Sequence, residues 1–318
     1  MGKLKRLVAR FDEMGRYPIQ ELGYSRLWLM LHYGWCFLLH RCTIADYFLY
    51  HFFARNRRGR KEFVTLYDMR EIHRKNPQTA FSDFEEKDRF LERFEAYAHR
   101  DWIGRVCRNS REEFDTFADK HPNCIIKART DCGGHGVELC TITDENREQV
   151  WERLVKDDMI AESLLVQCKE MASIHPSSVN TVRALTIRGK LVSAVLRMGV
   201  GGGFVDNGCS GGIFAGLDVD TGIVTTKGAD LMEHRFLKHP TTGIILPGFQ
   251  VPQWDMVRQT VEEAMAMVPD AVIVGWDVAI TEDGPVLIEG NCYPSVQIMQ
   301  TAGMEGMKRL WYDALNQK

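Results

Sequence analysis

Three residues with oxygen-bearing side chains, Asp277, Glu289 and Asn291, have the types and the spacing of ligands for a divalent cation. Carboxylate and amide oxygens are the ligands that Mg²⁺ prefers in proteins. Two carboxylates that face each other on neighbouring strands are destabilising unless something neutralises them. The trio therefore predicts a Mg²⁺ site, with a solvated acidic hairpin as the alternative.

The segment that carries this trio reads as a β-hairpin. Residues 272–281 and 285–289 are rich in β-branched side chains, and the acidic and glycine residues at 282–284 predict a three-residue turn between them. If Thr281 faces Pro285 across that turn, the two carboxylates stand directly opposite each other. Because strand residues alternate faces, the asparagine two positions further on points to the same side.

A second group of residues has the chemistry of a phosphate site. Lys127 ends a predicted buried strand, and Gly133, Gly134 and Gly136 follow in the next turn. Glycines let backbone N–H groups approach phosphate oxygens closely, and the lysine supplies a positive charge. The segment matches neither the P-loop nor the dinucleotide-binding pattern, so a hairpin flap over phosphates remains, with a plain β-turn as the alternative.

Two arginines lie on later predicted strands and add to this chemistry. Asn180 and Arg183 begin one strand, and Arg197 precedes a glycine-dense segment at 199–212. Guanidinium groups bind phosphate oxygens bidentately and can neutralise charge on a transferring phosphoryl group. The alternative for each arginine is an ordinary surface salt bridge.

The elements that position these groups divide into a helical front and an α+β body. Residues 1–110 predict helices, including 43–53 and 81–103, whereas from 111 onward strands and helices alternate. We expect a helical N-terminal region at 1–110, a small subdomain at 111–170 and a large subdomain at 171–318.

Charge is distributed unevenly over the 318 residues. The net charge is −3, yet residues 1–110 carry 21 basic against 14 acidic side chains, and most of this excess lies in 55–61. That basic segment is either a solvated helix end or a site for an anionic lipid surface, a nucleic acid or a polyanionic substrate. Nine cysteines without a CxxC pair and no secretory signal predict reduced thiols in the cytoplasm.

The most hydrophobic stretch, residues 28–40, is too short to span a bilayer as a helix. Its helical spacing of Leu, Met and Trp favours a buried core helix, with contact to a membrane surface as the alternative. We expect no transmembrane segment and no nucleic-acid partner.

Taken in chain order, these motifs resemble the ATP-grasp superfamily, and more narrowly the sugar-transfer-associated ATP-grasp family. The similarity covers about residues 80–300 and is most specific in GWDVAI (275–280), GPVLIEGN (284–291), Pro294 and Gln297. It implies an ATP-grasp fold, in which two α/β subdomains sandwich ATP, preceded here by a helical region.

The resemblance also implies roles for individual residues. Asp277, Glu289 and Asn291 would hold Mg²⁺, and Arg183 and Arg197 would contact the γ-phosphate or an acyl-phosphate. The implied nucleotide contacts comprise phosphate ligands, a covering loop, an adenine hinge and a ribose ligand: Lys87 and Lys127; Gly133, Gly134 and Gly136; Glu162, Leu164 and Leu165; and Glu170.

The implied activity is an ATP- and Mg²⁺-dependent ligation of a carboxylate to an amine through an acyl-phosphate, on small-molecule substrates that the family's name associates with sugars and cell-surface polysaccharide. The catalytic set would be Arg183, Arg197 and Asn180. Two alternatives stay open: a small-molecule kinase that stops at phosphoryl transfer, and a non-catalytic nucleotide-binding partner of a glycosyltransferase.

Overall fold

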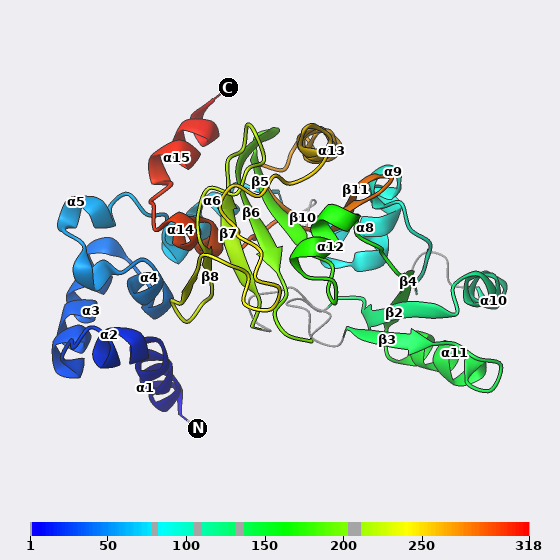
Figure 1. Ribbon diagram of the computed structural model, residues 1–318, viewed down its shortest axis with the longest axis horizontal. Helices are drawn as coiled ribbons and strands as arrows, with labels where there is room; N and C mark the ends of the chain where they lie inside the picture. The colour runs from blue at the N-terminus through cyan, green and yellow to red at the C-terminus, as the bar shows by residue number, and fades with distance from the viewer. Residues whose placement is uncertain (1, 78–81, 105–109, 131–136, 203–210, 318) are drawn as a thin grey trace.

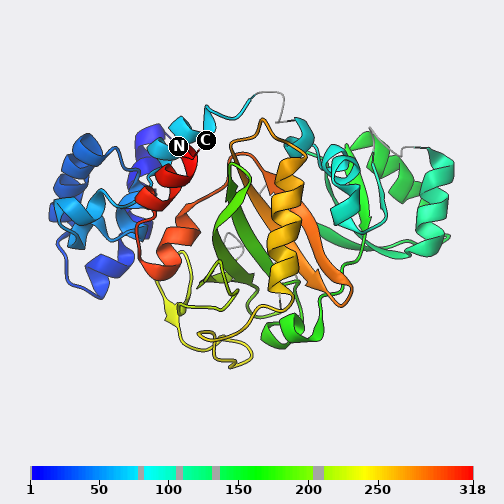
Figure 2. The same cartoon turned by 90° about the horizontal axis from the view of Figure 1, so that it is seen from above.

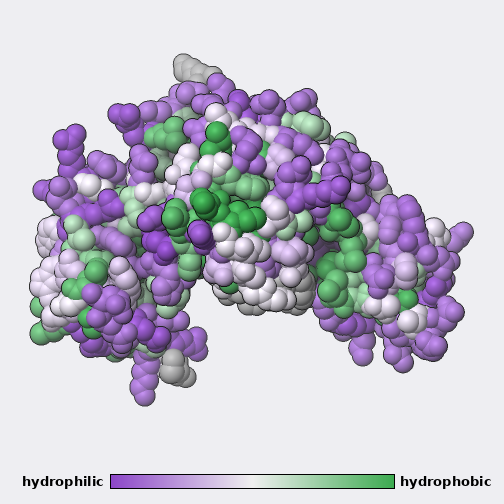
Figure 3. Space-filling model, in the orientation of Figure 1, coloured by the Kyte–Doolittle hydropathy of each residue, from purple (hydrophilic) through white to green (hydrophobic). Residues whose placement is uncertain are grey.

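The molecule is elongated and has three parts, arranged along its longest axis (Figure 1). The computed structural model describes residues 2–77, 82–104, 110–130, 137–202 and 211–317. N-terminal helices form one end, a large sheet with its helices forms the middle, and a small sheet with two helices forms the other end. The space-filling view shows that the surface is hollowed between the two ends (Figure 3).

The N-terminal end is helical, as the sequence predicts. Two of its helices begin with a capping box, in which Thr43 bonds Asp46 and Thr65 bonds Asp68, so each helix start is fixed by its own sequence. The elements of this end are α1 (Lys3–Met14), α2 (Arg16–Gln20), α3 (Arg26–His40), α4 (Ile44–Leu49), the 3₁₀ helix η1 (Phe52–Ala54), α5 (Arg57–Arg60) and α6 (Leu66–His73), the last of which leads into the middle part and packs on its sheet.

The helix α3 is not buried, and the expectation of a core helix at 28–40 is wrong. Only Leu29 and Cys36 of α3 are buried, whereas most of its other large side chains are exposed. The fully buried positions are therefore two turns apart, with half-buried His32 and Tyr33 between them, and this stripe is too narrow for a core helix.

The middle part is built on a seven-stranded antiparallel sheet with the order β11-β10-β5-β6-β7-β8-β9. Its long strands are rich in Val, Ile, Leu and Ala, and both faces carry buried side chains. The strands are β5 (Thr181–Ile187), β6 (Lys190–Met198), β7 (Ile213–Leu217), β8 (Gly228–Ala229), β9 (Arg235–Phe236), β10 (Ile273–Thr281) and β11 (Gly284–Asn291).

Helices cover both faces of this sheet, which gives it two separate hydrophobic layers. One face packs against α13, seen lying across the sheet in Figure 2, and against α7 to α9 and α12. The other face packs against α6, α14 and α15. The bounds of the helices not yet given are α7 (Ser82–Glu85), α8 (Lys87–Arg93), α9 (Glu95–Ala98), α12 (Lys169–Ile174), α13 (Trp254–Ala266), α14 (Gln297–Gly303) and α15 (Lys308–Asn316).

The small sheet at the other end has four antiparallel strands in the order β1-β4-β2-β3. Two helices, α10 and α11, cover one face and bury Phe114, Val150 and Leu154 against it. Its elements are β1 (Trp102–Ile103), α10 (Arg111–Lys120), β2 (Asn123–Ala128), β3 (Glu138–Thr141), α11 (Arg147–Lys156) and β4 (Met159–Ser163).

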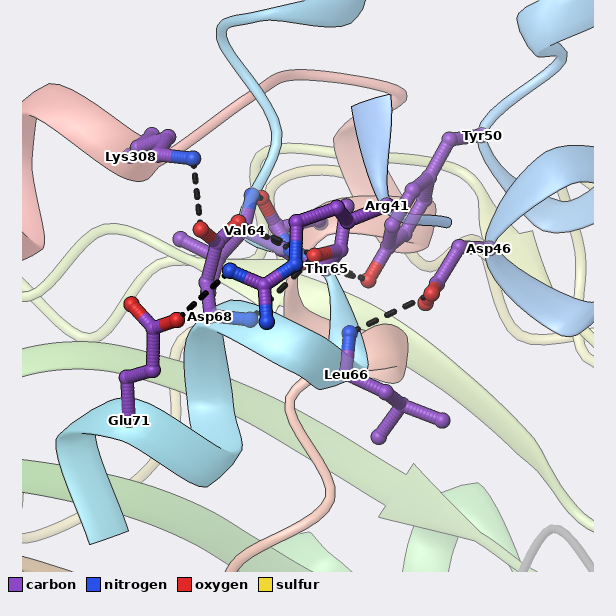
Figure 4. A network of polar contacts seen from close by, with 10 residues as sticks. Arg41, Asp46, Tyr50, Val64, Thr65, Leu66, Asp68, Glu71 and Lys308 are labelled. Carbon is purple, nitrogen blue, oxygen red and sulfur yellow. Dashed lines mark hydrogen bonds and ion pairs between the residues drawn. The ribbon is translucent and has the colours of Figure 1, made fainter. Parts of the chain in front are cut away.

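Polar contacts fasten the N-terminal helices to the middle part (Figure 4). The Asp46 carboxylate accepts from the Leu66 backbone N–H at 3.2 Å, and Lys308 of α15 pairs with Asp68 at 2.7 Å. A buried glutamine of α14, Gln300, completes the link through contacts with the main chain at Val64.

One expectation about the elements needs correction. The predicted helix at 81–103 is broken into three short helices by non-helical backbone at Glu86 and Phe94, and the last of them ends at His99, which adopts a left-handed conformation with φ 42°. Trp102–Ile103 forms a strand instead. A strand at 213–217 follows the glycine-dense segment that the sequence presents as a loop. The proposed division at 110/111 and 170/171 stays a prediction.

Candidate active site

The hairpin of β10 and β11 places Asp277 directly opposite Glu289, as predicted. The route to that register differs, because Thr281 pairs with Gly284 and the turn has two residues instead of three. A bulge compensates for the shorter turn, since Asp277 pairs with Glu289 whereas Val278 pairs with Leu287. Ile288 is therefore the extra residue, and it restores the facing of the two carboxylates.

Three charged residues form a row across adjacent strands of the large sheet. Arg183 of β5 pairs with Asp277 of β10, which pairs with Glu289 of β11. Because residues paired in this way project from the same face, their side chains are neighbours. Arg197 of β6 lies opposite Thr181, two positions before Arg183, and so reaches the row diagonally.

The carboxylate of Asp277 lies between two guanidinium groups. Arg183 donates from Nε to Oδ1 and from Nη2 to Oδ2, the latter at 2.7 Å, and Arg197 donates from Nη1 to Oδ2 at 2.9 Å. All three side chains are largely buried. Burial acts to raise the pKa of Asp277, but the charges of Arg183 and Arg197 outweigh it and lower that pKa below its ordinary value.

These contacts allow Asp277 and Glu289 to face each other in the absence of a metal ion. Two facing carboxylates need a neutralising charge, and Arg183 and Arg197 supply positive charge beside Asp277. The repulsion between Asp277 and Glu289 is therefore not by itself evidence for a metal. The two arginines are buried partners of a carboxylate, not surface salt bridges.

The same residues still fit a hard divalent cation by their donor chemistry. An ionised carboxylate has about four lone-pair sites, and the arginines occupy three on Asp277, which leaves one on Oδ1. Glu289 adds a half-buried carboxylate directly opposite, and Asn291 follows on the same strand, with its Oδ1 accepting from the Tyr293 N–H at 2.8 Å. Within the described parts of the chain, no group of three or more His, Cys, Asp or Glu residues could hold a metal ion, so a metal here would need the arrangement of two carboxylates and an amide.

Lys127 of β2 lies in a second buried ionic cluster, on the small sheet. Its ammonium pairs with Glu162 Oε1 at 2.6 Å, and Arg100 donates from Nε to Glu162 Oε2 at 2.8 Å. Burial acts to raise the pKa of Glu162, but the charges of Arg100 and Lys127 outweigh it and lower the pKa to about 2. The carboxylate is thus ionised, and it orients both cations.

Arg100, which the sequence analysis missed, joins the two clusters. Its guanidinium also donates to the carbonyl oxygens of Leu287 at 2.6 Å and Ile288 at 2.9 Å. The bulge thus presents a carbonyl of its extra residue to an arginine that lies between α9 and β1. No motif marks Arg100 in the sequence, because its partners lie 62 and 187 or 188 residues away.

Buried hydrogen bonds of the Asn180 side chain hold the segment around it in place. Asn180 is fully buried, and its amide nitrogen donates to Gln167 Oε1, the Met171 carbonyl and the His175 carbonyl, at 2.9 to 3.0 Å. These contacts hold the chain between β4 and β5 in shape. The predicted catalytic role of Asn180 stays a prediction, and its surroundings favour a structural one.

The remaining predicted nucleotide contacts lie around the small sheet. Leu164 is 41% exposed directly after β4, Leu165 is half-buried, and Glu170 is exposed on α12. Lys87 begins α8, and its backbone N–H donates to the Arg129 carbonyl at 3.0 Å beyond the end of β2. Gly133, Gly134 and Gly136 lie outside the described residues.

A family model described as sugar-transfer-associated ATP-grasp matches residues 73–314. No curated protein matches the chain. Among solved structures, the ATP-grasp ligase PsnB complexed with a phosphomimetic variant of its minimal precursor, Mg and ADP aligns at 13% identity and TM-score 0.46, over 76% of this chain and 60% of that one. D-alanine–D-alanine ligase from Bacillus anthracis aligns at 12% identity and TM-score 0.45, over 76% and 68%. D-cycloserine synthetase DcsG aligns at 12% identity and TM-score 0.42, over 77% and 78%.

The chain thus spans about 60% of the length of the PsnB chain. The family match covers the broken helices at 82–98, both sheets and their covering helices from α7 onward, and it leaves outside α1 to α5 and all of α6 but His73. With a match over most of its length, the chain belongs to the sugar-transfer-associated ATP-grasp family.

Proposed function

We propose that the protein is a Mg²⁺- and ATP-dependent ligase that joins a carboxylate to an amine through an acyl-phosphate. The observation that carries the proposal is the row of the largely buried Arg183 and Asp277 and the half-buried Glu289, with Arg197 beside it, in a chain of the ATP-grasp family. Buried cations and carboxylates on one sheet face suit a site where phosphoryl charge is transferred.

In the proposed reaction, a carboxylate oxygen of the substrate attacks the γ-phosphorus of ATP, and the bond from that phosphorus to the bridging oxygen of ADP breaks. The amine nitrogen then attacks the acyl carbon, inorganic phosphate leaves, and the nitrogen loses a proton. Arg183 and Arg197 stabilise charge on the transferred phosphoryl group, and Lys127 stabilises charge on the nucleotide phosphates. No protein nucleophile is required.

Asp277, Glu289 and Asn291 would hold the cation, which when bound neutralises phosphate charge and orients the phosphate oxygens. Lys87 would contact the phosphates, and the main chain from Glu162 to Leu165 would contact the adenine. Glu170 would contact the ribose.

The family's association with sugar transfer supports a substrate linked to a sugar, as in the decoration of a cell-surface polysaccharide. The protein would be assayed with Mg-ATP and a panel of uronic acids and amino acids as carboxylates, with amino sugars and amino acids as amines. We expect ADP release that depends on one carboxylate and an amide product. ATP turnover that never depends on a carboxylate would contradict the ligase.

Isotope labelling separates the ligase from a kinase. If the carboxylate is labelled with ¹⁸O, the acyl-phosphate route transfers one labelled oxygen to the released phosphate. A kinase that phosphorylates a hydroxyl gives ADP and a stable phosphorylated product, and it releases no inorganic phosphate. ATP binding without any turnover across the panel would favour a non-catalytic nucleotide-binding partner.

The first prediction concerns the charged row. Glu289→Gln and Arg197→Met should each lower the rate by about 100-fold or more, because Glu289→Gln removes a carboxylate ligand of the cation and Arg197→Met removes positive charge beside the transferring group. Asp283→Asn, an exposed substitution in the turn of the same hairpin, is the matched control and should leave the rate unchanged. Full activity of Glu289→Gln at all Mg²⁺ concentrations would refute the metal assignment.

A further inference from the structure

The helix α3 exposes an apolar face that no other described element covers. Leu27, Leu31 and Leu38 are 67%, 69% and 76% exposed. At 100° per residue, they and Gly34 lie opposite the buried stripe formed by Leu29 and Cys36. Solvent therefore meets leucine where a surface helix ordinarily presents charged side chains.

The flanks of this face are apolar as well. Trp28 and Trp35 are exposed on one side, and Met30 and Phe37 are exposed on the other. No Asp, Glu, Lys or Arg occurs between the helix ends at Arg26 and Arg41. Contiguous exposed apolar surface of this kind marks an interaction site.

Basic side chains border the face. Residues 25–61 contain seven Lys or Arg and one Asp or Glu, a net charge of +6. The segment α5 contacts α3 directly, since Arg60 donates to His32 Nε2 at 3.0 Å and lies over the Trp35 ring at 5.3 Å. Green atoms lie among purple ones at this end of the molecule in Figure 3.

The exposed cations of this segment lie close to the C-terminal half of α3. Burial lowers the pKa of His40, and the positive charges of Arg60, Arg57 and Lys61 lower it further, as expected for basic groups nearby. Arg57, Arg58 and Lys61 are exposed to solvent. An apolar helix face thus has positive charge beside it.

We propose that this face of α3, with the basic segment 55–61, docks on an anionic lipid bilayer. Leucines would enter the boundary between headgroups and acyl chains, the tryptophans would lie at the interface, and the arginines would contact lipid phosphates. The helix of 15 residues is about 22 Å long and would lie in the membrane plane. Within the parts of the chain that the structure describes, no helix is long and apolar enough to cross a membrane.

Charge distinguishes a bilayer from a second copy of the chain. A symmetric dimer through α3 would bring two identical basic segments together, and like charges at an interface oppose association. An anionic surface instead neutralises them. The proposal concerns α3 to α5, which the family match does not include, so it does not depend on the proposed enzymatic activity.

The second prediction is tested by flotation of the full chain with vesicles. We expect binding to vesicles of phosphatidylcholine mixed with phosphatidylglycerol, weaker binding at high salt, and little binding to phosphatidylcholine alone. Leu31→Glu/Leu38→Glu should weaken binding at least about tenfold, because it removes buried apolar area and adds negative charge. Arg57→Glu/Arg58→Glu should weaken it about tenfold or more through charge.

Leu310→Glu is the matched control, since Leu310 is 50% exposed on α15 and should float as the unchanged protein does. Equal circular dichroism and melting temperature show that the variants are folded. The proposal is overturned if the unchanged protein does not float, or if Leu31→Glu/Leu38→Glu floats equally well. It is also overturned if sedimentation velocity without vesicles shows a dimer that this double variant dissociates and no variant or parent binds lipid.

Discussion

Two buried carboxylates, Asp277 and Glu162, are each held between two cations. Asp277 pairs with Arg183 and Arg197, and Glu162 pairs with Arg100 and Lys127. Removing one member of a buried pair leaves an uncompensated charge, which costs more than the pair itself contributes. The free-energy cost of replacing one residue of each cluster therefore depends on whether its partners are present.

The third prediction concerns the pH dependence of stability. The pKa of Glu162 falls from its ordinary value of 4.5 to about 2 in the folded protein, so its stabilisation is present above pH 4.5 and is lost as the pH falls towards 2. The difference corresponds to about 3 kcal/mol of unfolding free energy at neutral pH. Glu162→Gln should lower stability at pH 7 and reduce its loss between pH 4.5 and 2.

Urea unfolding at a series of pH values measures this effect. Glu152→Gln, an exposed change on α11, controls for the loss of a surface carboxylate. An acid limb of the stability profile that is the same in Glu162→Gln and the parent would show that the buried triad is not its source.

At the scale of elements, one arginine from the end of the broken helices connects the two sheets. Arg100 follows α9, contacts Glu162 on β4 and donates to two carbonyls of β11. The bulge at Ile288 makes one of these carbonyls available to a side chain while keeping Glu289 opposite Asp277. The nucleotide side and the metal side of the proposed site are therefore linked through Arg100.

The fourth prediction is that Arg100→Met lowers the unfolding free energy by about 3 kcal/mol, since it leaves Glu162 with one cation and two carbonyls without a donor. Arg100→Lys should restore only part of this, because an ammonium cannot bond three acceptors in the planar geometry of a guanidinium. Besides the unfolding free energy, hydrogen exchange at residues 286–290 would be measured, because Arg100 donates to the carbonyls of Leu287 and Ile288. The affinity for Mg-ATP would be measured as well.

Arg93→Met is the control, since Arg93 is exposed on α8 and donates to a single carbonyl, that of Met267. A stable Arg100→Met protein with unchanged exchange in β11 would rule out the positioning role.

At the scale of the whole molecule, the N-terminal helices and the body form one folded structure. Gln300 of α14 is fully buried, accepts from the Val64 N–H at 2.8 Å, and donates to the Val64 carbonyl and the Tyr50 hydroxyl at 2.9 Å each. A helix near the end of the chain thus satisfies the main chain of a segment more than 200 residues earlier. The proposed membrane face is thereby held in a fixed relation to the body.

The fifth prediction is that Gln300→Leu lowers the unfolding free energy by about 2–4 kcal/mol, because the N–H groups of Val64 and Met307 lose their acceptor, Gln300 Oε1. The Val64 carbonyl keeps the Tyr50 hydroxyl as a donor at 3.2 Å. Thermal unfolding followed by circular dichroism would measure the change. Gln317→Leu, at an exposed position just after α15, is the control. Equal melting temperatures for Gln300→Leu and the parent would show that Gln300 does not hold the N-terminal helices on the body.

Local sequence determined much of this protein. The strand pattern of 272–291, the helix starts with their capping residues, and the facing of Asp277 and Glu289 follow from side-chain periodicity and turn chemistry, which act over a few residues. The family resemblance and its fold were also readable from contiguous motifs. Even so, the register was obtained with a turn one residue too long, an error that the bulge at Ile288 cancels.

Tertiary structure alone decided which charges meet and which apolar surface stays exposed. The partners of Asp277 and Glu162, and the role of Arg100, depend on chain segments far apart in sequence, for which spacing carries no information. The burial of residues 28–40 was predicted wrongly for the same reason, because an apolar helix is buried only if another element covers it. The sequence determines the chemistry of each side chain, whereas the packing of distant segments determines which groups that side chain contacts.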